Sequence, residues 1–274
     1  EQQAYAHLQS IVKNRHIDII ISDNRYYFRH ENIISILLCH QLSPELPKGF
    51  SLFKRQFQKR VAHLMNHFDE VWVPDFEAKN SLSGQLSINP FLEIPAIHIG
   101  VLSRFDELPA SDEKEKHVLI ASGPQPQLDI LISEFIRIYS STVTSLTIIT
   151  SSPYNNKNTL NNVEVLVLSS DEEFAYRIQS ASHIISRSGY SSVMDFIALN
   201  RTALLIPTPG QTEQEYLAEH LKKFGFSSMK QKDLLTTTSP EGLIKPKKLN
   251  LQRDIHKSLS ENIKRLINEI SQNE

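Results

Sequence analysis

The chain has 274 residues, of which 40% are hydrophobic and 22% charged, and its formal net charge is −2. This length allows two globular domains with separate cores, and the near-neutral charge excludes a global bias toward nucleic acid or membrane. Cys39 is the single cysteine, which excludes a disulfide framework and favours a reducing, cytoplasmic compartment. No apolar run has the length of a membrane-spanning helix, and no signal peptide is visible.

The first part of the chain combines helix-like and strand-like segments. We expect a helix over residues 4–13 and buried strands at 17–21, 33–39, 71–73 and 96–99. Between the second and third strands, an apolar series with i, i+3, i+4 spacing predicts an amphipathic helix: Phe50, Phe53, Phe57, Val61, Leu64 and Phe68. An α/β domain normally starts with a strand, and the first residue is Glu rather than Met. We therefore expect the start of this N-terminal domain, at 1–102, to be missing.

A charged, proline-containing stretch at 103–116 is typical of a linker, and we expect the domain boundary there. A second domain is expected at 117–247, followed by a C-terminal helix in 248–274 with its apolar positions over 249–270. The second domain is predicted to contain strands at 118–120, 146–150, 163–168, 184–186 and 203–206, and helices at 127–139, 172–180, 192–199 and 213–224. Strands that alternate with helices predict an α/β fold with parallel sheets flanked by helices.

Residues 183–196 form the most informative segment. Its apolar run ends in Ser186-Arg187-Ser188-Gly189, and a helix is expected to open at Ser191-Ser192 with Asp195 in its first turn. The free N–H groups and the dipole of a helix N-terminus attract anions, and ligands of open α/β sheets bind beyond the carboxyl ends of strands. The alternative is a plain turn in which Ser192 and Asp195 form a capping box.

Two other loops follow expected strand ends, namely Ser122-Gly123-Pro124-Gln125 and residues 207–214. In a parallel sheet these loops and the turn at 187–190 lie at the same end of the strands. They offer hydroxyls, amides and helix N-termini, which suit a phosphate-bearing ligand with sugar hydroxyls. The alternative is that each loop is only a turn.

The usual signals of several other chemistries are absent. The sequence lacks a phosphate-binding loop of the Walker type, a dinucleotide G-x-G-x-x-G after a strand, a G-x-S-x-G elbow and zinc-ligand spacing. His40 lies just past an expected strand end and is a candidate catalytic group, although a lone histidine is more often structural.

Residues 46–68 contain no acidic side chain. The basic residues concentrated in 48–60 alternate with aromatic and aliphatic ones, and they are Lys48, Lys54, Arg55, Lys59 and Arg60. Positive charge beside aromatic side chains suits peripheral contact with an anionic membrane or with an acceptor phosphate. The alternative is a core-facing helix whose solvated face happens to be basic.

A longer pattern in the second half resembles the C-terminal domain of family 28 glycosyltransferases, of which the MurG-type UDP-N-acetylglucosamine transferases are the best known. The matching residues are Arg187-Ser188-Gly189, Ser192-Val193, Asp195, Ala198-Leu199, 203–207 and Glu213-Gln214. The resemblance covers residues 117–225 and extends more weakly to 38–41 and 98–104. It implies a GT-B architecture of two Rossmann-like domains, with an incomplete N-terminal domain on the acceptor side.

The resemblance also implies a donor site for a UDP-sugar, with no metal and no further cofactor. Asp195 takes the position of a ribose-binding carboxylate, where the family usually has Glu. Ser122 and Gly123 face the diphosphate, and Arg104 and the backbone near Phe174 border the base. The complete implied donor-binding set is Arg104, Ser122, Gly123, Phe174, Arg187, Ser188, Gly189, Ser192, Asp195, Glu213 and Gln214.

The sequence departs from the family pattern in its first half. The family's first strand and its glycine-rich loop with a histidine have no counterpart, so we expect the chain as given to be inactive. The resemblance implies a hexosyltransferase-type enzyme that moves a sugar from a UDP-sugar to an acceptor hydroxyl in cell-envelope or glycan synthesis. A lipid-linked acceptor and a location on the inner face of the membrane are expected. Two alternatives stay open: a nucleotide-sugar hydrolase or epimerase on the same scaffold, and a non-catalytic donor-binding subunit.

Overall fold

A computed structural model describes residues 2–47, 49–105, 116–150, 160–167, 170–251 and 257–273. The chain forms two compact units: Glu1–Val101 with Gln252–Glu274, and Leu102–Leu251. The expected linker at 103–116 starts where the second unit starts, but its residues 106–115 lie outside the described part, as does Lys48. None of the helices in the described part of the chain combines the length and apolar composition needed to cross a bilayer.

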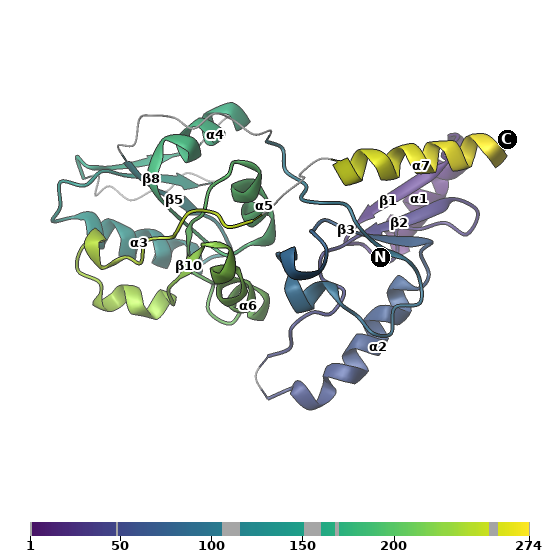
Figure 1. The fold of residues 1–274 in the computed structure, drawn as a ribbon, viewed down its shortest axis with the longest axis horizontal. Helices are drawn as coiled ribbons and strands as arrows, with labels where there is room; N and C mark the ends of the chain where they lie inside the picture. The colour runs from purple at the N-terminus through teal and green to yellow at the C-terminus, as the bar shows by residue number, and fades with distance from the viewer. Residues whose placement is uncertain are drawn as a thin grey trace. The chain divides into compact units, whose positions relative to one another are not determined.

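The first unit contains a four-stranded parallel sheet with the order β1-β2-β3-β4. Its strands are β1 (Ile19–Asp23), β2 (Ile34–Leu38), β3 (Glu70–Val73) and β4 (Ala96–His98). Its helices are α1 (Gln2–Asn14), α2 (Lys54–Met65) and α7 (Lys257–Asn273) (Figure 1). Arg265 of α7 donates a 2.7 Å hydrogen bond to Glu70 at the start of β3. This bond joins the C-terminal segment to the sheet formed by residues 19–98.

The helix expected around residues 50–68 is shorter and less buried than its apolar pattern predicts. A 3₁₀ turn at Ser51–Phe53 precedes α2, and the helix packs on the core only through its C-terminal half. Val61 and Phe68 are buried as expected, but the other four positions of the pattern are exposed, namely Phe50, Phe53, Phe57 and Leu64. The periodicity therefore predicted the helix correctly but not how much of it contacts the sheet.

The second unit contains a six-stranded parallel sheet with the order β10-β9-β8-β5-β6-β7. Its strands are β5 (Lys116–Ala121), β6 (Leu146–Thr150), β7 (Val163–Leu166), β8 (Ala181–Ser186), β9 (Leu204–Leu205) and β10 (Ser227–Ser228). Its helices are α3 (Gln127–Tyr139), α4 (Asp171–Ser180), α5 (Tyr190–Ala198) and α6 (Thr212–His220), and 3₁₀ turns cover Leu221–Phe224, Gln231–Thr236 and Pro240–Gly242. The expected α/β class with parallel sheets and flanking helices is confirmed.

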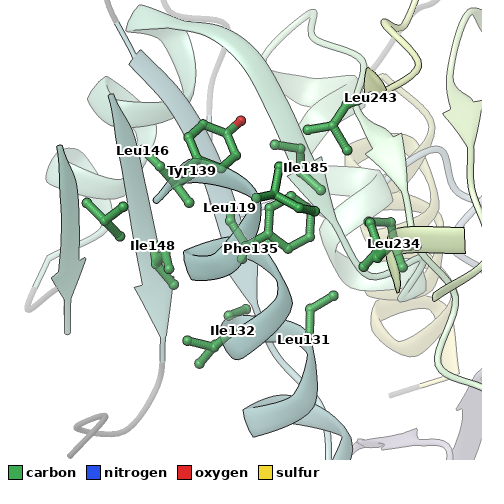
Figure 2. Close-up of a cluster of buried hydrophobic side chains, with 14 of the residues drawn as sticks. Leu119, Leu131, Ile132, Phe135, Tyr139, Leu146, Ile148, Ile185, Leu234 and Leu243 are labelled. Carbon is green, nitrogen blue, oxygen red and sulfur yellow. The ribbon is translucent and has the colours of Figure 1, made fainter. Parts of the chain in front are cut away.

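Alternation along the strands explains how both faces of this sheet are covered. Leu119 and Ile185 belong to a buried cluster with α3, and Figure 2 shows Phe135 of that helix facing them. Their strand neighbours Val118 and Ile184 are also buried, and successive strand side chains point to opposite faces. Figure 1 shows α3 and α4 on either side of β5 and β8. Burial on both faces requires near-continuous apolar strands, which the sequence contains.

Two expected helix starts are wrong. Helix α5 begins at Tyr190 with Gly189 as N-cap, and no described side chain caps it. Asp195 is therefore in the second turn of α5, too far from the N-terminus for the capping box suggested as an alternative. The C-terminal helix was expected from 249, but residues 249–251 are not helical, and the amide of Asn250 bonds the carbonyl of Phe224 instead.

Candidate functional site

Three loops meet at the carboxyl ends of neighbouring strands in the second unit. Strands β9, β8 and β5 are adjacent and parallel. The loops that follow them therefore lie together at the edge of the sheet where the strands end. These loops contain Ser122 and Gly123 after β5, the turn 187–189 after β8, and Thr208 after β9. The sequence-based placement of the three loops at one end of the strands agrees with this topology.

Arg187 connects these loops from inside the protein. Its side chain is 1% exposed, and its guanidinium donates to the carbonyls of Gln127 (2.9 Å), Ile206 (3.2 Å) and Pro207 (3.4 Å). Burial lowers the pKa of Arg187 to about 10, so the group remains cationic at neutral pH. The guanidinium is thus placed to hold the loops together rather than to reach a ligand directly.

Ser188 and Gln214 join the starts of α5 and α6. The buried Ser188 hydroxyl donates to the Gln214 carbonyl oxygen at 2.8 Å. The Gln214 side chain accepts from the amide of Thr208 at 2.9 Å and donates to Gln211 Oε1 at 2.5 Å. Glu213 lies beside it in the first turn of α6. The polar atoms of Ser188 and Gln214 therefore shape the loop after β9.

The N-cap residue of α5 has empty space beside it. Gly189, its N-cap, has a φ of −71°, and a Cβ atom added there would meet nothing within 4 Å. No described side chain caps this helix, and an uncapped helix N-terminus is a type of position where anions bind in proteins. Ser192, half-buried in this first turn, adds a hydroxyl near the same end.

Gly123 and Thr208 bring two of the loops close together. Gly123 is exposed with a φ of +116°, a conformation that favours glycine, and its added Cβ would lie 3.8 Å from Thr208 Oγ1. The Thr208 hydroxyl is buried without a hydrogen-bond partner among the described residues, as is that of Ser186 at the end of β8. Buried hydroxyls are normally paired, so water or a ligand is expected beside them. The half-buried Ser122 precedes Gly123.

Asp195 places a carboxylate on the second turn of α5. Its Oδ1 accepts a 2.7 Å hydrogen bond from the Ser103 hydroxyl, and its Oδ2 lies 3.8 Å from Arg104 Nε. Burial raises the pKa of the Asp195 carboxyl, while the Ser103 hydrogen bond and the charge of Arg104 lower it and Asp171 raises it. Sequence reasoning missed Ser103, because nothing in the sequence links it to a residue 92 positions away.

Arg104, Phe105 and Phe174 pack together at the start of α4. The Arg104 guanidinium lies 4.8 Å from the ring centre of Phe105 and 5.0 Å from that of Phe174. These two rings stack with 5.6 Å between centres and an interplanar angle of 5°. Arg104 also bonds the Asp171 carboxylate at 2.5 Å. The structure thus brings two of the predicted site residues together with Asp195.

The second unit therefore combines a helix N-terminus that lacks a side-chain cap with a carboxylate that can accept hydrogen bonds from hydroxyl groups. Asp195 follows Gly189 by six positions, which is roughly 9 Å along the helix. A ligand that carries phosphate and sugar hydroxyls matches this pairing of charge and hydrogen-bond acceptor. Within the part of the chain that is described, no cluster of three or more His, Cys, Asp or Glu side chains is arranged to hold a metal ion.

The first unit contains the remaining predicted residues. His40 lies two residues past the end of β2 and is half-buried. Apolar and basic side chains are exposed or half-exposed at the start of α2 and just before it, and we call this set the α2 surface: Phe50, Leu52, Phe53, Phe57, Lys54, Arg55, Lys59 and Arg60. Leu52 is 91% exposed, and Arg55 and Lys59 lie 5.8 and 5.3 Å from the ring centre of Phe91. The alternative of a core-facing helix with a basic solvated face fits the C-terminal half of α2, which buries Val61, Ala62 and Met65, but it does not account for the exposed apolar residues at and before the start of the helix.

Comparisons with known proteins agree with this architecture. Residues 106–273 match the family model described as glycosyltransferase family 28 C-terminal domain. No curated protein sequence matches the chain at a significant level.

The solved structures that are similar to the chain include a MurG, TcCGT1 and the glycosyltransferase CalG4. The MurG structure of Acinetobacter baumannii has 14% identity and a TM-score of 0.50, covering 86% of this chain and 67% of that one. TcCGT1 in complex with UDP has 12% identity and a TM-score of 0.57, with coverages of 86% and 71%. The calicheamicin glycosyltransferase CalG4 has 12% identity and a TM-score of 0.53, with coverages of 98% and 75%. At such identities these similarities show the fold alone.

Proposed function

The chain belongs to glycosyltransferase family 28, whose C-terminal domain model matches more than half of it, and we propose that it transfers a sugar from a UDP-sugar to an acceptor hydroxyl. The observation that carries this proposal is the uncapped N-terminus of α5 on the same helix as the Asp195 carboxylate. The diphosphate would bind at this helix N-terminus, and the ribose hydroxyls would donate to Asp195. The UDP that is bound in the similar TcCGT1 structure supports this choice of nucleotide.

The reaction requires charge stabilisation at the departing diphosphate. In the proposed transfer, the acceptor oxygen forms a bond to the anomeric carbon while the bond from that carbon to the diphosphate oxygen breaks. The electron pair leaves with UDP, and the dipole and N–H groups of α5 stabilise it. Because these groups neutralise the leaving group, we propose that transfer needs no metal ion. His40 stays the candidate base that the sequence predicts, with no further support.

The α2 surface suggests where the acceptor is found. Leu52, Phe50 and Phe53 are exposed just before α2, and the basic groups of Arg55 and Lys59, on the helix itself, lie over the ring of Phe91. Aromatic and aliphatic side chains next to positive charge bind interfaces that contain anionic lipids. We therefore propose peripheral membrane contact through this surface, a lipid-linked acceptor and a role in cell-envelope synthesis.

Calorimetric titration of the chain with UDP, GDP and dTDP in the presence of EDTA tests the donor site. Saturable binding that is tightest for UDP and unchanged by EDTA is expected. If no nucleotide binds, or if binding needs a divalent cation, the proposed donor site is wrong. Incubation with UDP-sugars then separates the activities: free sugar released without an acceptor would favour the hydrolase alternative, and transfer to lipid-linked acceptors would support the transferase.

A further inference from the structure

The Ser103 hydroxyl is fixed by two hydrogen bonds. It donates to Asp195 Oδ1 at 2.7 Å and accepts from the backbone amide of Phe105 at 3.1 Å. A serine hydroxyl has a single hydrogen to donate, so the Phe105 amide orients it with that hydrogen toward the carboxylate. The segment that contains Ser103 is held in place by Phe105, which is 5% exposed and stacks on Phe174.

The other oxygen of Asp195 is left for a ligand. Asp195 Oδ2 accepts no hydrogen bond from the described residues, and Arg104 Nε is 3.8 Å away. The Asp195 side chain is 16% exposed, so the carboxylate is partly accessible to a ligand. A carboxylate offers about four lone-pair sites, of which Ser103 occupies one. The remaining sites suffice for the two vicinal hydroxyls of a ribose.

We propose that Ser103 is a positioning residue that orients the Asp195 carboxylate for the 2′- and 3′-hydroxyls of the donor ribose and thereby sets selectivity for ribonucleotides over deoxyribonucleotides. This inference rests on the proposed donor site. Without the Ser103 hydroxyl, the carboxylate can rotate toward Arg104, and the geometry needed for two ribose hydroxyls is lost. The loss of binding affinity is confined to nucleotides that carry both ribose hydroxyls.

The Ser103 hydrogen bond also counteracts the effect of burial on the pKa of Asp195. Burial raises the pKa of Asp195, and Ser103 and Arg104 counteract it, while Asp171 adds to the increase. The charged neighbours of Asp195 are Arg104, in the 103–105 segment, and Asp171, in the first turn of α4. Removing the hydroxyl is therefore expected to shift the acid limb of UDP binding to higher pH.

The test measures binding of UDP, 2′-deoxy-UDP and 3′-deoxy-UDP to the full chain by calorimetry. Ser103→Ala is expected to weaken UDP binding roughly tenfold and deoxynucleotide binding much less, and Ser103→Thr is expected to restore selectivity. When Asp195 is already replaced by Asn, the further change Ser103→Ala should weaken UDP binding only slightly, because Ser103 acts through the Asp195 carboxylate. Ser140→Ala, which removes a hydroxyl bonded to Arg137 at the far end of α3, is the matched control and should bind as the wild type does.

The outcomes separate this inference from the proposed function. If the wild-type chain binds no ribonucleotide, the donor site itself is wrong and the inference is overturned with it. If UDP binds but Ser103→Ala weakens UDP and deoxy-UDP equally, or adds its full effect to Asp195→Asn, this inference alone is overturned. A UDP-binding pH profile that is identical in wild type and Ser103→Ala would also contradict it.

Discussion

Arg187 Nη2 donates a 2.9 Å hydrogen bond to the backbone carbonyl of Gln127, which joins the turn after β8 to the first residue of α3. The same guanidinium reaches the carbonyls of Ile206 and Pro207 after β9. A single buried side chain thus ties three segments at the carboxyl ends of the strands. A planar group with five donors is suited to this task, whereas a lysine could not replace its geometry.

We expect Arg187→Met to lower the free energy of unfolding by about 3 kcal/mol, because it leaves buried carbonyls without a donor. UDP affinity should fall as well, because the loops lose their common support. Urea denaturation and UDP titration measure the two effects. Arg201→Met is the matched control: Arg201 is bonded to the carbonyls of Gln179 and Ala181 at the opposite ends of the strands. It should destabilise the protein while UDP affinity stays normal, and an equal loss of affinity in both variants would contradict the assignment.

Gly189→Val tests the helix N-terminus directly. The added side chain meets no atom of the protein within 4 Å of its Cβ, so the cost is that of a poor N-cap, about 1 kcal/mol. The valine side chain would occupy the space beside the N-terminus of α5, and we expect UDP affinity to fall at least tenfold. Gly225→Ala is the contrasting control. There φ is +102° and a Cβ would lie 2.3 Å from the Lys248 carbonyl oxygen, so stability should fall while the folded protein binds UDP normally. Unchanged UDP affinity in Gly189→Val would rule out this anion site.

The fold of the second unit could be predicted because its elements are marked locally. The helix at Gln127–Tyr139 and the strand at Leu146–Thr150 have the expected bounds, since each shows a clear apolar period between turn residues. Strand β10 was missed because its two residues, Ser227 and Ser228, form no apolar run. The exposed start of α2 was misjudged because periodicity shows which side of a helix is apolar and not what covers it.

The site could be predicted at the level of loops but not of individual contacts. Strand order places the loops together, and strand–turn–helix patterns are visible in the sequence. The family resemblance places Arg187 among the residues that bind the donor, yet its side chain is buried. Only the folded chain reveals that its two terminal nitrogens donate to backbone carbonyls, while its Nε has no partner among the described residues. The Ser103–Asp195 hydrogen bond spans 92 positions, a distance over which a single sequence carries no pairing signal.

His183 predicts how stability depends on pH. Burial, followed by the charges of His117 and Lys245, lowers the pKa of His183 from 6.5 to about 4. Between these pH values the unfolded chain binds a proton that the folded chain does not, so stability is full above about pH 6.5 and is lost as the pH falls toward 4. At pH 5 the loss due to His183 is about 2 kcal/mol.

Urea denaturation of His183→Leu at pH 7 and pH 5 measures this contribution. The decrease in unfolding free energy between these pH values should be about 2 kcal/mol smaller than in wild type. A shallower decrease should remain, because burial also lowers the pKa of His117. His16→Gln, at an exposed position, should keep the full dependence. A decrease of wild-type size in His183→Leu would show that other groups cause the acid sensitivity.

The α2 surface predicts a lipid dependence that can be measured without substrate. Leu52→Asp with Phe53→Asp should reduce binding to phosphatidylserine vesicles at least tenfold, because it removes two exposed apolar side chains and adds negative charge. Lys59→Glu with Arg60→Glu should weaken binding to these vesicles and remove its salt dependence, since each basic group contributes about 1 kcal/mol near an anionic surface. Flotation with vesicles of neutral and anionic lipid measures both effects.

The control for this surface is an equally exposed apolar residue elsewhere. Val143 of the second unit is 98% exposed, so Val143→Asp adds a charge with little effect on folding. If membrane contact depended only on general hydrophobicity or net charge, this variant would lose vesicle binding as the α2 variants do. Retained binding in Val143→Asp together with loss in Leu52→Asp/Phe53→Asp would assign the contact to the α2 surface. Wild-type binding that is equal on neutral and anionic vesicles would remove the role of the basic residues, because their contribution requires negative lipid charge.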